Sequence, residues 1–247
     1  MPQSAFPVRL TGFQLKLLAA AAMLADHIAA VVLIPVFGTS ALTFALRAVG
    51  RIAFPLYCFL LAEGFRHTRN RRNYALRLGF FALLSEIPFD LAFNGCLIEL
   101  RDNNVFFTLL LSFLLLWAMD GLRAVLDRRL PLDGAPVLRP LLYAAGAAVL
   151  LAAAYGAARL LQADYGFAGI LCVLVIWLLS GHPALGLLCC AAVLVHFYGS
   201  NSFFVLLAIP PVLLYNGERG RSGKHGFYLF YPLHLLALRA VAYLLTT

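Results

Sequence analysis

Apolar residues fill long segments along almost the whole chain, and short stretches rich in Gly, Pro, Ser, Asn or Arg separate them. An α-helix of roughly 20 apolar residues matches the hydrocarbon core of a bilayer. The pattern therefore predicts an all-α polytopic membrane protein with about nine transmembrane helices in one domain, 1–247. The sixth to eighth helices are short, so one of them is alternatively a re-entrant segment. The predicted helices cover 13–36, 41–65, 76–93, from 104, 140–158, from 165, after 183, after 201, and 227–245.

The composition agrees with this pattern and excludes a soluble protein. Hydrophobic residues make up 63% of the 247 positions, charged residues make up 12%, and the mean hydropathy is +0.89. A soluble domain is only about half apolar. The net charge of +8 would suit a nucleic-acid partner in a soluble protein. Here the basic residues fall mainly in short connections between apolar segments, so they predict orientation in the lipid bilayer and no contact with nucleic acid.

The basic connections also predict the side of the membrane on which each end lies. Arginines concentrate at 66–77, 123–139 and 216–226, which fall on one side if the predicted helices alternate in direction. Basic residues are enriched in cytoplasmic loops. We therefore predict that the N-terminus, with Arg9 and Lys16, is cytoplasmic and that the C-terminus is external. The five cysteines form no CxxC motif, so the sequence predicts no metal site.

Asp26 and His27 form an adjacent polar pair within the first predicted helix. Ionisable residues at membrane depth are costly and mark functional or paired positions. Lys16 precedes His27 by 11 positions, so an ideal helix places them on nearly one face, about 16 Å apart along the axis. That stripe suits a substrate with an anionic head and a long thin arm, such as coenzyme A. We predict that His27 is a general base supported by Asp26; alternatively, the pair only joins helices.

Two charged pairs follow in the second and third predicted helices. Arg47 and Arg51 are one helical turn apart, and so are Glu86 and Asp90. Since unpaired charges are costly in hydrocarbon, we expect the two pairs to face each other. They form either a structural ion-pair network or part of a substrate site.

Other ionisable residues complete the candidate set. Glu63 lies in the second predicted helix, and His234 follows Tyr231 and Pro232 in the last one. We group Glu63 and His234 with Glu86 and Asp90 as a substrate-binding or structural network. Asp164 directly precedes the sixth predicted helix, which is a common position for a residue that caps the helix N-terminus.

Several of these strings resemble those of one known family. The similarity spans nearly the whole chain, and the joined string from Arg47 to Thr108 is specific. The chain resembles TraX proteins in the following strings: Lys16-Leu-Leu-Ala to Met23-Leu-Ala-Asp26-His27; Arg47-Ala-Val-Gly50-Arg51-Ile-Ala-Phe-Pro55 to Glu63-Gly64-Phe65; Ser85-Glu86-Ile-Pro88-Phe89-Asp90; Asn104-Val-Phe-Phe107-Thr108; Asp164-Tyr165-Gly166; and Tyr231-Pro232-Leu-His234.

This resemblance implies an activity. TraX proteins of conjugative plasmids acetylate the N-terminus of the pilin subunit in the bacterial inner membrane, so the resemblance implies a multi-pass acetyltransferase that uses acetyl-CoA. The spacing of Lys16 and His27 also resembles the Arg/Lys-x10-His signature of acyltransferase family 3. That likeness implies that His27 is catalytic and that Lys16 contacts the phosphates of coenzyme A. The implied acceptor is pilin or another envelope molecule.

The sequence thus predicts an acetyltransferase of the inner (cytoplasmic) membrane that transfers acetyl from cytoplasmic acetyl-CoA to an amine or hydroxyl, with His27 and Asp26 as catalytic residues. Lys16, Arg47 and Arg51 are the predicted cofactor-binding residues, and either arginine could instead orient the acceptor or stabilise the developing oxyanion. The alternative is a proton-coupled transporter that uses the same buried charges as a relay. A third reading is a non-catalytic membrane assembly factor.

Overall fold

The computed structural model of the protein is built from α-helices with short π-helical and 3-10 segments. It describes residues 9–129, 137–221 and 224–246, and those residues contain no β-strand. The predicted all-α fold class is therefore confirmed for the described residues. The elements are α1 (Gly12–His27), η1 (Ile28–Leu33), α2 (Ile34–Phe37), α3 (Ala41–Gly50), α4 (Ala53–His67), α5 (Arg71–Phe93), α6 (Val105–Arg129), α7 (Leu138–Leu160), α8 (Gly166–Leu178), α9 (Pro183–Tyr198), η2 (Ser200–Ala208), α10 (Ile209–Leu213) and α11 (Lys224–Thr246).

The chain is a membrane protein with several long apolar helices. In the described part, five helical stretches are long and apolar enough to cross a bilayer: Gly12–Phe37, Ala41–His67, Val105–Arg129, Leu138–Leu160 and Gly226–Thr246. The predicted count of about nine spans therefore stays a prediction. Helix α5 has 23 residues, but arginines and carboxylates interrupt its apolar sequence.

The predicted sixth to eighth helices correspond to three short helical stretches, α8, α9 and η2 with α10. Helix α8 has 13 residues, which reach about 20 Å and fall short of the roughly 30 Å of hydrocarbon. Ile170, Cys172 and Val173 in α8 are nevertheless fully buried, because α4, α6 and α9 pack around this helix. A helix enclosed by protein need not match the bilayer thickness.

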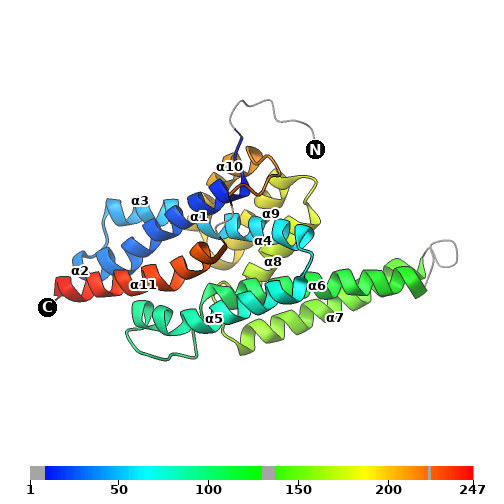
Figure 1. Ribbon diagram of the computed structural model, residues 1–247, viewed down its shortest axis with the longest axis horizontal. Coiled ribbons are helices and arrows are strands. Elements are labelled where there is room, and N and C mark those ends of the chain that lie inside the picture. Colours follow the sequence, from blue (N-terminus) through cyan, green and yellow to red (C-terminus); the bar gives the residue numbers. More distant parts are fainter. Residues whose placement is uncertain (1–8, 130–136, 222–223, 247) are drawn as a thin grey trace.

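The last helix, α11, lies between α1 and α5, so the first and last helices of the chain pack together. Helix α11 packs against α5 on one side and against α1 and η1 on the other (Figure 1). The start of α1 is also held to the connection that leads into α11, since Gly12 N donates to the carbonyl of Glu218 at 2.8 Å and Leu10 N donates to that of Leu214 at 2.8 Å. This packing brings residues of α11 beside the polar middle of the first span.

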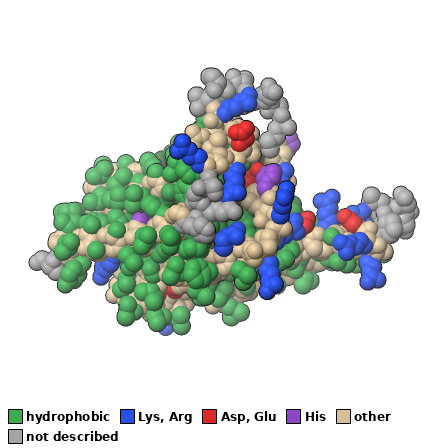
Figure 2. Space-filling model, viewed as in Figure 1, with side chains coloured by type: hydrophobic (Ala, Val, Ile, Leu, Met, Phe, Trp, Pro, Cys, Tyr) green, Lys and Arg blue, Asp and Glu red, His purple; other side chains and the backbone are tan. Residues whose placement is uncertain are grey.

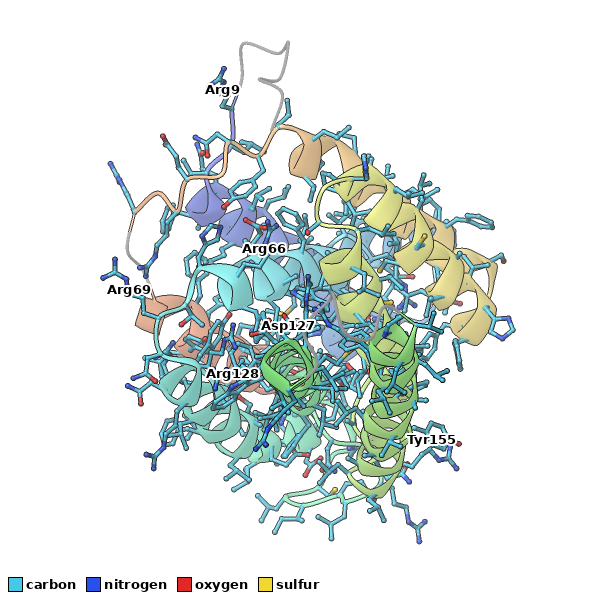
Figure 3. All side chains as sticks on the ribbon, turned by 90° about the vertical axis from the view of Figure 1, so that its right-hand side faces the viewer. Arg9, Arg66, Arg69, Asp127, Arg128 and Tyr155 are labelled. Atoms are coloured by element: carbon cyan, nitrogen blue, oxygen red, sulfur yellow. The ribbon has the colours of Figure 1, made fainter. Side chains whose placement is uncertain are left out.

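Charge is distributed unevenly between the two ends of the molecule. Lysine and arginine side chains gather over the right-hand part of the face in Figure 2, whereas apolar side chains cover most of the left-hand part. Figure 3 looks onto that basic end, where Arg9, Arg66, Arg69 and Arg128 lie. The turns 38–40, 94–104 and 161–165 connect helices at the opposite end (Figure 1). Residues 222–223 of the basic connection 216–226 lie outside the described residues. The positive-inside rule predicts that the basic end is cytoplasmic.

Candidate active site

Two histidines 207 positions apart in the sequence meet between α1 and α11. His27 is the last residue of α1, and His234 lies in the middle of α11, where it is only 6% exposed. The Nδ1 atom of His27 is 2.7 Å from Nε2 of His234. The two rings are parallel within 5° and their centroids are 5.0 Å apart. Because the two nitrogens are so close, this separation of the centroids means that the imidazoles meet edge to edge rather than face to face, as a hydrogen bond between them requires.

The backbone of α11 determines which nitrogen of His234 carries the proton. The carbonyl oxygen of Phe230, one turn before His234, lies 2.8 Å from Nδ1 of this histidine. Because a carbonyl oxygen only accepts, this contact assigns the proton of a neutral His234 to Nδ1. Its Nε2 then accepts from Nδ1 of His27, which leaves Nε2 of His27 with a lone pair. In this arrangement Nε2 of His27 can accept a proton or a hydrogen bond.

Aromatic rings hold the two imidazoles in place. Phe93 of α5 meets His27 edge to face with 5.3 Å between ring centroids, and Tyr231 does so at 6.3 Å. The ring of Phe230 stacks on His234 at 4.7 Å. Rings packed on several sides restrict the rotation of both histidines, which keeps their shared hydrogen bond aligned.

Asp26 turns away from this pair and bonds to the second span. Its Oδ2 accepts from Nη1 of Arg47 at 2.6 Å, and the Arg47 and Asp26 side chains are 35% and 17% exposed. Gly50 permits this contact, since a Cβ at that position would lie only 2.6 Å from Cγ of Asp26. Adjacent helix positions point about 100° apart, so Asp26 meets α3 whereas His27 meets α11. The structure places His234, and not Asp26, in hydrogen-bond contact with His27.

The first span becomes irregular directly after His27, where the π-helix η1 begins. Pro35 has no N–H to donate to the carbonyl of Val31, as a continuous α-helix would require. Short π-helical turns occur frequently at functional sites. The π-helix η1 therefore places an irregular stretch of backbone next to the histidine pair.

The second span is broken as well, between α3 and α4. Arg51 N bonds to the carbonyls of Arg47 and Ala48 at 3.2 and 3.3 Å, which is a tightened last turn of α3. Pro55 removes the donor that the Arg51 carbonyl would meet in an α-helix. Both broken helices thus carry the charged residues of the site.

Arg51 lies beside the short connection that precedes α8. It interacts electrostatically with the Asp164 carboxylate and with the Tyr165 hydroxyl. Burial raises the pKa of Asp164 to about 7, and the nearby charge of Asp102 adds to the rise. Tyr165 has a left-handed φ of 58° and its ring stacks on Phe54 with centroids 3.7 Å apart. A left-handed tyrosine is costly, so packing holds this connection in place.

The carboxylates of α5 anchor the connection between α5 and α6. Asn104 donates its side-chain amide to Glu86 and to the carbonyl of Ala82, the second at 2.8 Å. Asp90 is fully buried and accepts from the Asn94 side chain at 3.2 Å and from Glu99 N at 2.8 Å. These contacts fix a turn at the end of the molecule opposite the basic end.

Metal ligation finds no support among the residues that the structure describes. They include no group of three or more His, Cys, Asp or Glu side chains positioned to hold a metal ion. All five cysteines are free thiols, and Cys58, Cys172 and Cys190 are buried. The chemistry that the described site residues offer is that of imidazole, carboxylate and guanidinium groups.

Comparison with known proteins places nearly the whole chain in one family. The model of the family described as TraX protein matches residues 11–242. The chain belongs to the TraX family. It is also 31% identical over 250 residues to a probable fimbrial assembly protein FimC, serogroup H1, of Dichelobacter nodosus, and the match covers 92% of this chain and 94% of that relative. No solved structure matches.

The structure of this TraX-family chain brings some predicted site residues together and separates others. His27 pairs with His234, and Asp26 pairs with Arg47. The two pairs are neighbours because Asp26 and His27 are consecutive, and Arg51 lies one turn beyond Arg47. The expected pairing of these arginines with the carboxylates of α5, Glu86 and Asp90, is wrong, because α5 packs on α6 and α11 rather than on α3.

Glu63 and Lys16 lie outside that central group. Glu63 is 9% exposed and pairs with Arg66 at 3.1 Å and with His67 at 3.4 Å near the end of α4, which favours its structural role. The Nζ atom of Lys16 lies 6.0 Å from the ring centroid of Phe227 at the start of α11. Since α1 is continuous over Gly12–His27, Lys16 and His27 are about 16 Å apart along the axis.

Sequence reasoning missed three features of the TraX-family site. The Phe230 carbonyl that orients His234 and the Tyr165 ring beside Arg51 were not predicted, because a backbone contact and a left-handed turn leave no residue-type signal. Asn104 was detectable, since its side chain caps the start of α6 by accepting from Phe106 N at 3.0 Å, a role typical of Asn. Asp164 is not the predicted cap of α8, because Tyr165 occupies that position.

Proposed function

We propose that this TraX-family chain is an acetyltransferase of the bacterial inner membrane that transfers acetyl from acetyl-CoA to an amine of a pilin-related acceptor. The observation that carries the proposal is the hydrogen-bonded pair of His27 and His234, with Nε2 of His27 left as a base. Family membership and the fimbrial assembly name of the relative support the acceptor class.

The proposed reaction is direct transfer. The acceptor amine attacks the thioester carbonyl carbon, so that a C–N bond forms and the C–S bond breaks. His27 Nε2 takes the proton that the amine loses and then delivers it to the departing thiolate of CoA. While His27 holds the extra proton, His234 shares the positive charge through the hydrogen bond between the rings, and the Phe230 carbonyl stabilises that charge.

The position of Lys16 determines the side of the membrane from which acetyl-CoA binds in this proposal. In this proposal its ammonium binds a phosphate of acetyl-CoA near the basic end, and the thin pantetheine arm extends along α1 toward His27. The axial distance of about 16 Å suits an extended chain rather than a compact ligand. The likeness of this spacing to acyltransferase family 3 stays a prediction.

The experiment incubates purified protein in nanodiscs with labelled acetyl-CoA and synthetic peptides that carry a free α-amine. We expect His27→Ala to lower transfer about 10²- to 10⁴-fold, the usual contribution of a general base. His234→Ala should lower the rate less and change the pH profile, because His234 positions His27 without touching the substrate. His196→Ala is the matched control, since this histidine lies on α9 away from the pair.

Two results would overturn the proposal in different ways. If the wild-type protein neither binds acetyl-CoA nor transfers label to any acceptor, the acetyltransferase activity is wrong. If His27→Ala retains the full rate of transfer and behaves like His196→Ala, the activity stands and the assignment of the base is wrong.

A proton-coupled transporter is the second candidate, and the two broken helices favour it. η1 and the α3–α4 break lie next to intramembrane charges, an arrangement that transporters use to bind ions. Reconstitution in liposomes with a pH gradient tests this candidate. Solute uptake that depends on the gradient and is lost in His27→Ala supports it, whereas acetyl transfer without uptake rejects it.

A further inference from the structure

A groove opens between α3 and η2 at the end of the molecule opposite the basic end. Its volume is about 300 Å³. Arg47 of α3, its C-terminal cap Arg51 and Asn201 of η2 line it, together with Ser40 and Thr43, whose hydroxyls bond to each other's backbone in the capping box that begins α3. The groove therefore combines two guanidinium groups, of which Arg47 pairs with Asp26 and Arg51 lies near Asp164, with the uncharged amide of Asn201.

An aromatic wall closes one side of this groove. Phe44 of α3 and Phe204 of η2 line it, and their rings meet edge to face with centroids 5.9 Å apart. Apolar walls lower the local dielectric and strengthen the attraction between a guanidinium and an anion. The groove is thus suited to an anionic group on an otherwise apolar or peptide-like ligand.

Arg47 connects this groove to the histidine pair. One of its nitrogens bonds to Asp26, the residue before His27, at 2.6 Å. A guanidinium has five N–H donors, and the side chain of Arg47 stays 35% exposed. Its remaining donors are thus available to a ligand in the groove, in the planar arrangement that matches a carboxylate.

The groove and Lys16 lie toward opposite ends of the first two spans. The groove is bordered by the turn 38–40, before α3, and by the start of η2, whereas Lys16 lies one turn into α1 at the end that carries most arginines. A donor bound at Lys16 and a ligand bound at Arg47 would therefore approach His27 from opposite directions.

We propose that the groove binds a carboxylate of the peptide acceptor and admits that acceptor from the external face. The inference rests on the proposed acetyl transfer and adds the side of entry and the recognised group. Arg47 binds the carboxylate through its remaining donors, Arg51 adds a second positive charge while it faces Asp164 and Tyr165, and the free α-amine extends past Arg47 to Nε2 of His27. Coenzyme A stays on the cytoplasmic side throughout.

The test introduces a charge into the groove from outside. Asn201→Cys is made in a Cys96→Ser, Cys189→Ser background, because those two cysteines are not fully buried. The thiol is labelled with membrane-impermeant methanethiosulfonates of similar size, one carrying a sulfonate and one a trimethylammonium group. Phe203→Cys is the matched control, since it lies on η2 with 57% exposure and does not line the groove.

We measure KM separately for acetyl-CoA and for two free-amine peptides that differ only in an aspartate or asparagine near the N-terminus. The aspartate peptide should be the better acceptor, and the sulfonate label on Asn201→Cys should raise its KM about tenfold, the effect of losing one charge-assisted contact. The trimethylammonium label should raise it less. KM for acetyl-CoA and all values for labelled Phe203→Cys should stay unchanged.

Other outcomes overturn the inference and are distinguishable from one another. If the label raises KM for acetyl-CoA instead, the groove binds the donor. If the aspartate and asparagine peptides behave alike, or if vesicles of phosphatidylethanolamine accept the acetyl group in place of both peptides, a peptide carboxylate is not the recognised group. Absence of transfer in all unlabelled proteins overturns the proposed function itself.

Discussion

Gly50→Ala is expected to separate α1 from α3 at the candidate site. A Cβ at position 50 would lie 2.6 Å from Cγ of Asp26 and closer still to its Cβ. An ordinary van der Waals contact begins at 3.4 Å, so the two helices must move apart by about 1 Å or Asp26 must change rotamer. Either movement strains the ion pair between Asp26 and Arg47.

The cost follows from the size of this clash. Forcing one extra carbon into a packed interface typically costs about 1–3 kcal/mol, and weakening the partly exposed ion pair adds up to about 1 kcal/mol. For a protein of this length each kcal/mol lowers Tm by roughly 2–4 °C. The two terms together make about 1–4 kcal/mol, so we expect Tm to fall by roughly 2–16 °C in Gly50→Ala.

Thermal unfolding in detergent can be followed with a thiol-reactive fluorophore. The assay uses the Cys96→Ser, Cys189→Ser background, in which the remaining thiols, Cys58, Cys172 and Cys190, are buried in the fold and react only as the protein unfolds. Gly156→Ala in α7 is the control, because a Cβ there has nothing within 4 Å. Replacing this helical glycine should raise stability by about 0.5–1 kcal/mol. An unchanged or raised Tm in Gly50→Ala would refute the close approach of α1 and α3.

Three further predictions concern the ends of the site. Asn104→Ala should lower the free energy of unfolding by about 1–3 kcal/mol, measured by thermal unfolding, because Glu86 loses its buried donor; Asn104→Gln should restore part of it. The pKa of Asp164 is raised from 3.8 to about 7, so the folded protein binds this proton more tightly than the unfolded chain does, and wild-type Tm should rise as the pH falls from about 8 to about 5. Asp164→Asn should remove about 1–2 kcal/mol of the change in the free energy of unfolding over this pH range. Lys16→Ala should raise KM for acetyl-CoA about tenfold in the transfer assay, and Lys16→Arg should retain most of the affinity.

Much of the helical framework could be predicted from the sequence. Apolar segments separated by turn residues indicate the observed order of helices, because a backbone in hydrocarbon must satisfy its hydrogen bonds within each segment. The breaks at η1 and between α3 and α4 were harder to predict. Pro35 and Pro55 mark positions where a helical donor is missing, but they do not say whether the helix bends, tightens or becomes a π-helix.

Residue types and their spacing were enough to show a membrane protein in which His27, Asp26 and Arg47 lie where uncompensated polar groups are costly. They left the partners of these residues open. Adjacent helix positions face different neighbours, so it is the packing of α3 and α11 around α1 that pairs Asp26 with Arg47 and His27 with His234. The two histidines are 207 positions apart, and a contact over that separation is fixed by the tertiary arrangement of helices rather than by local periodicity.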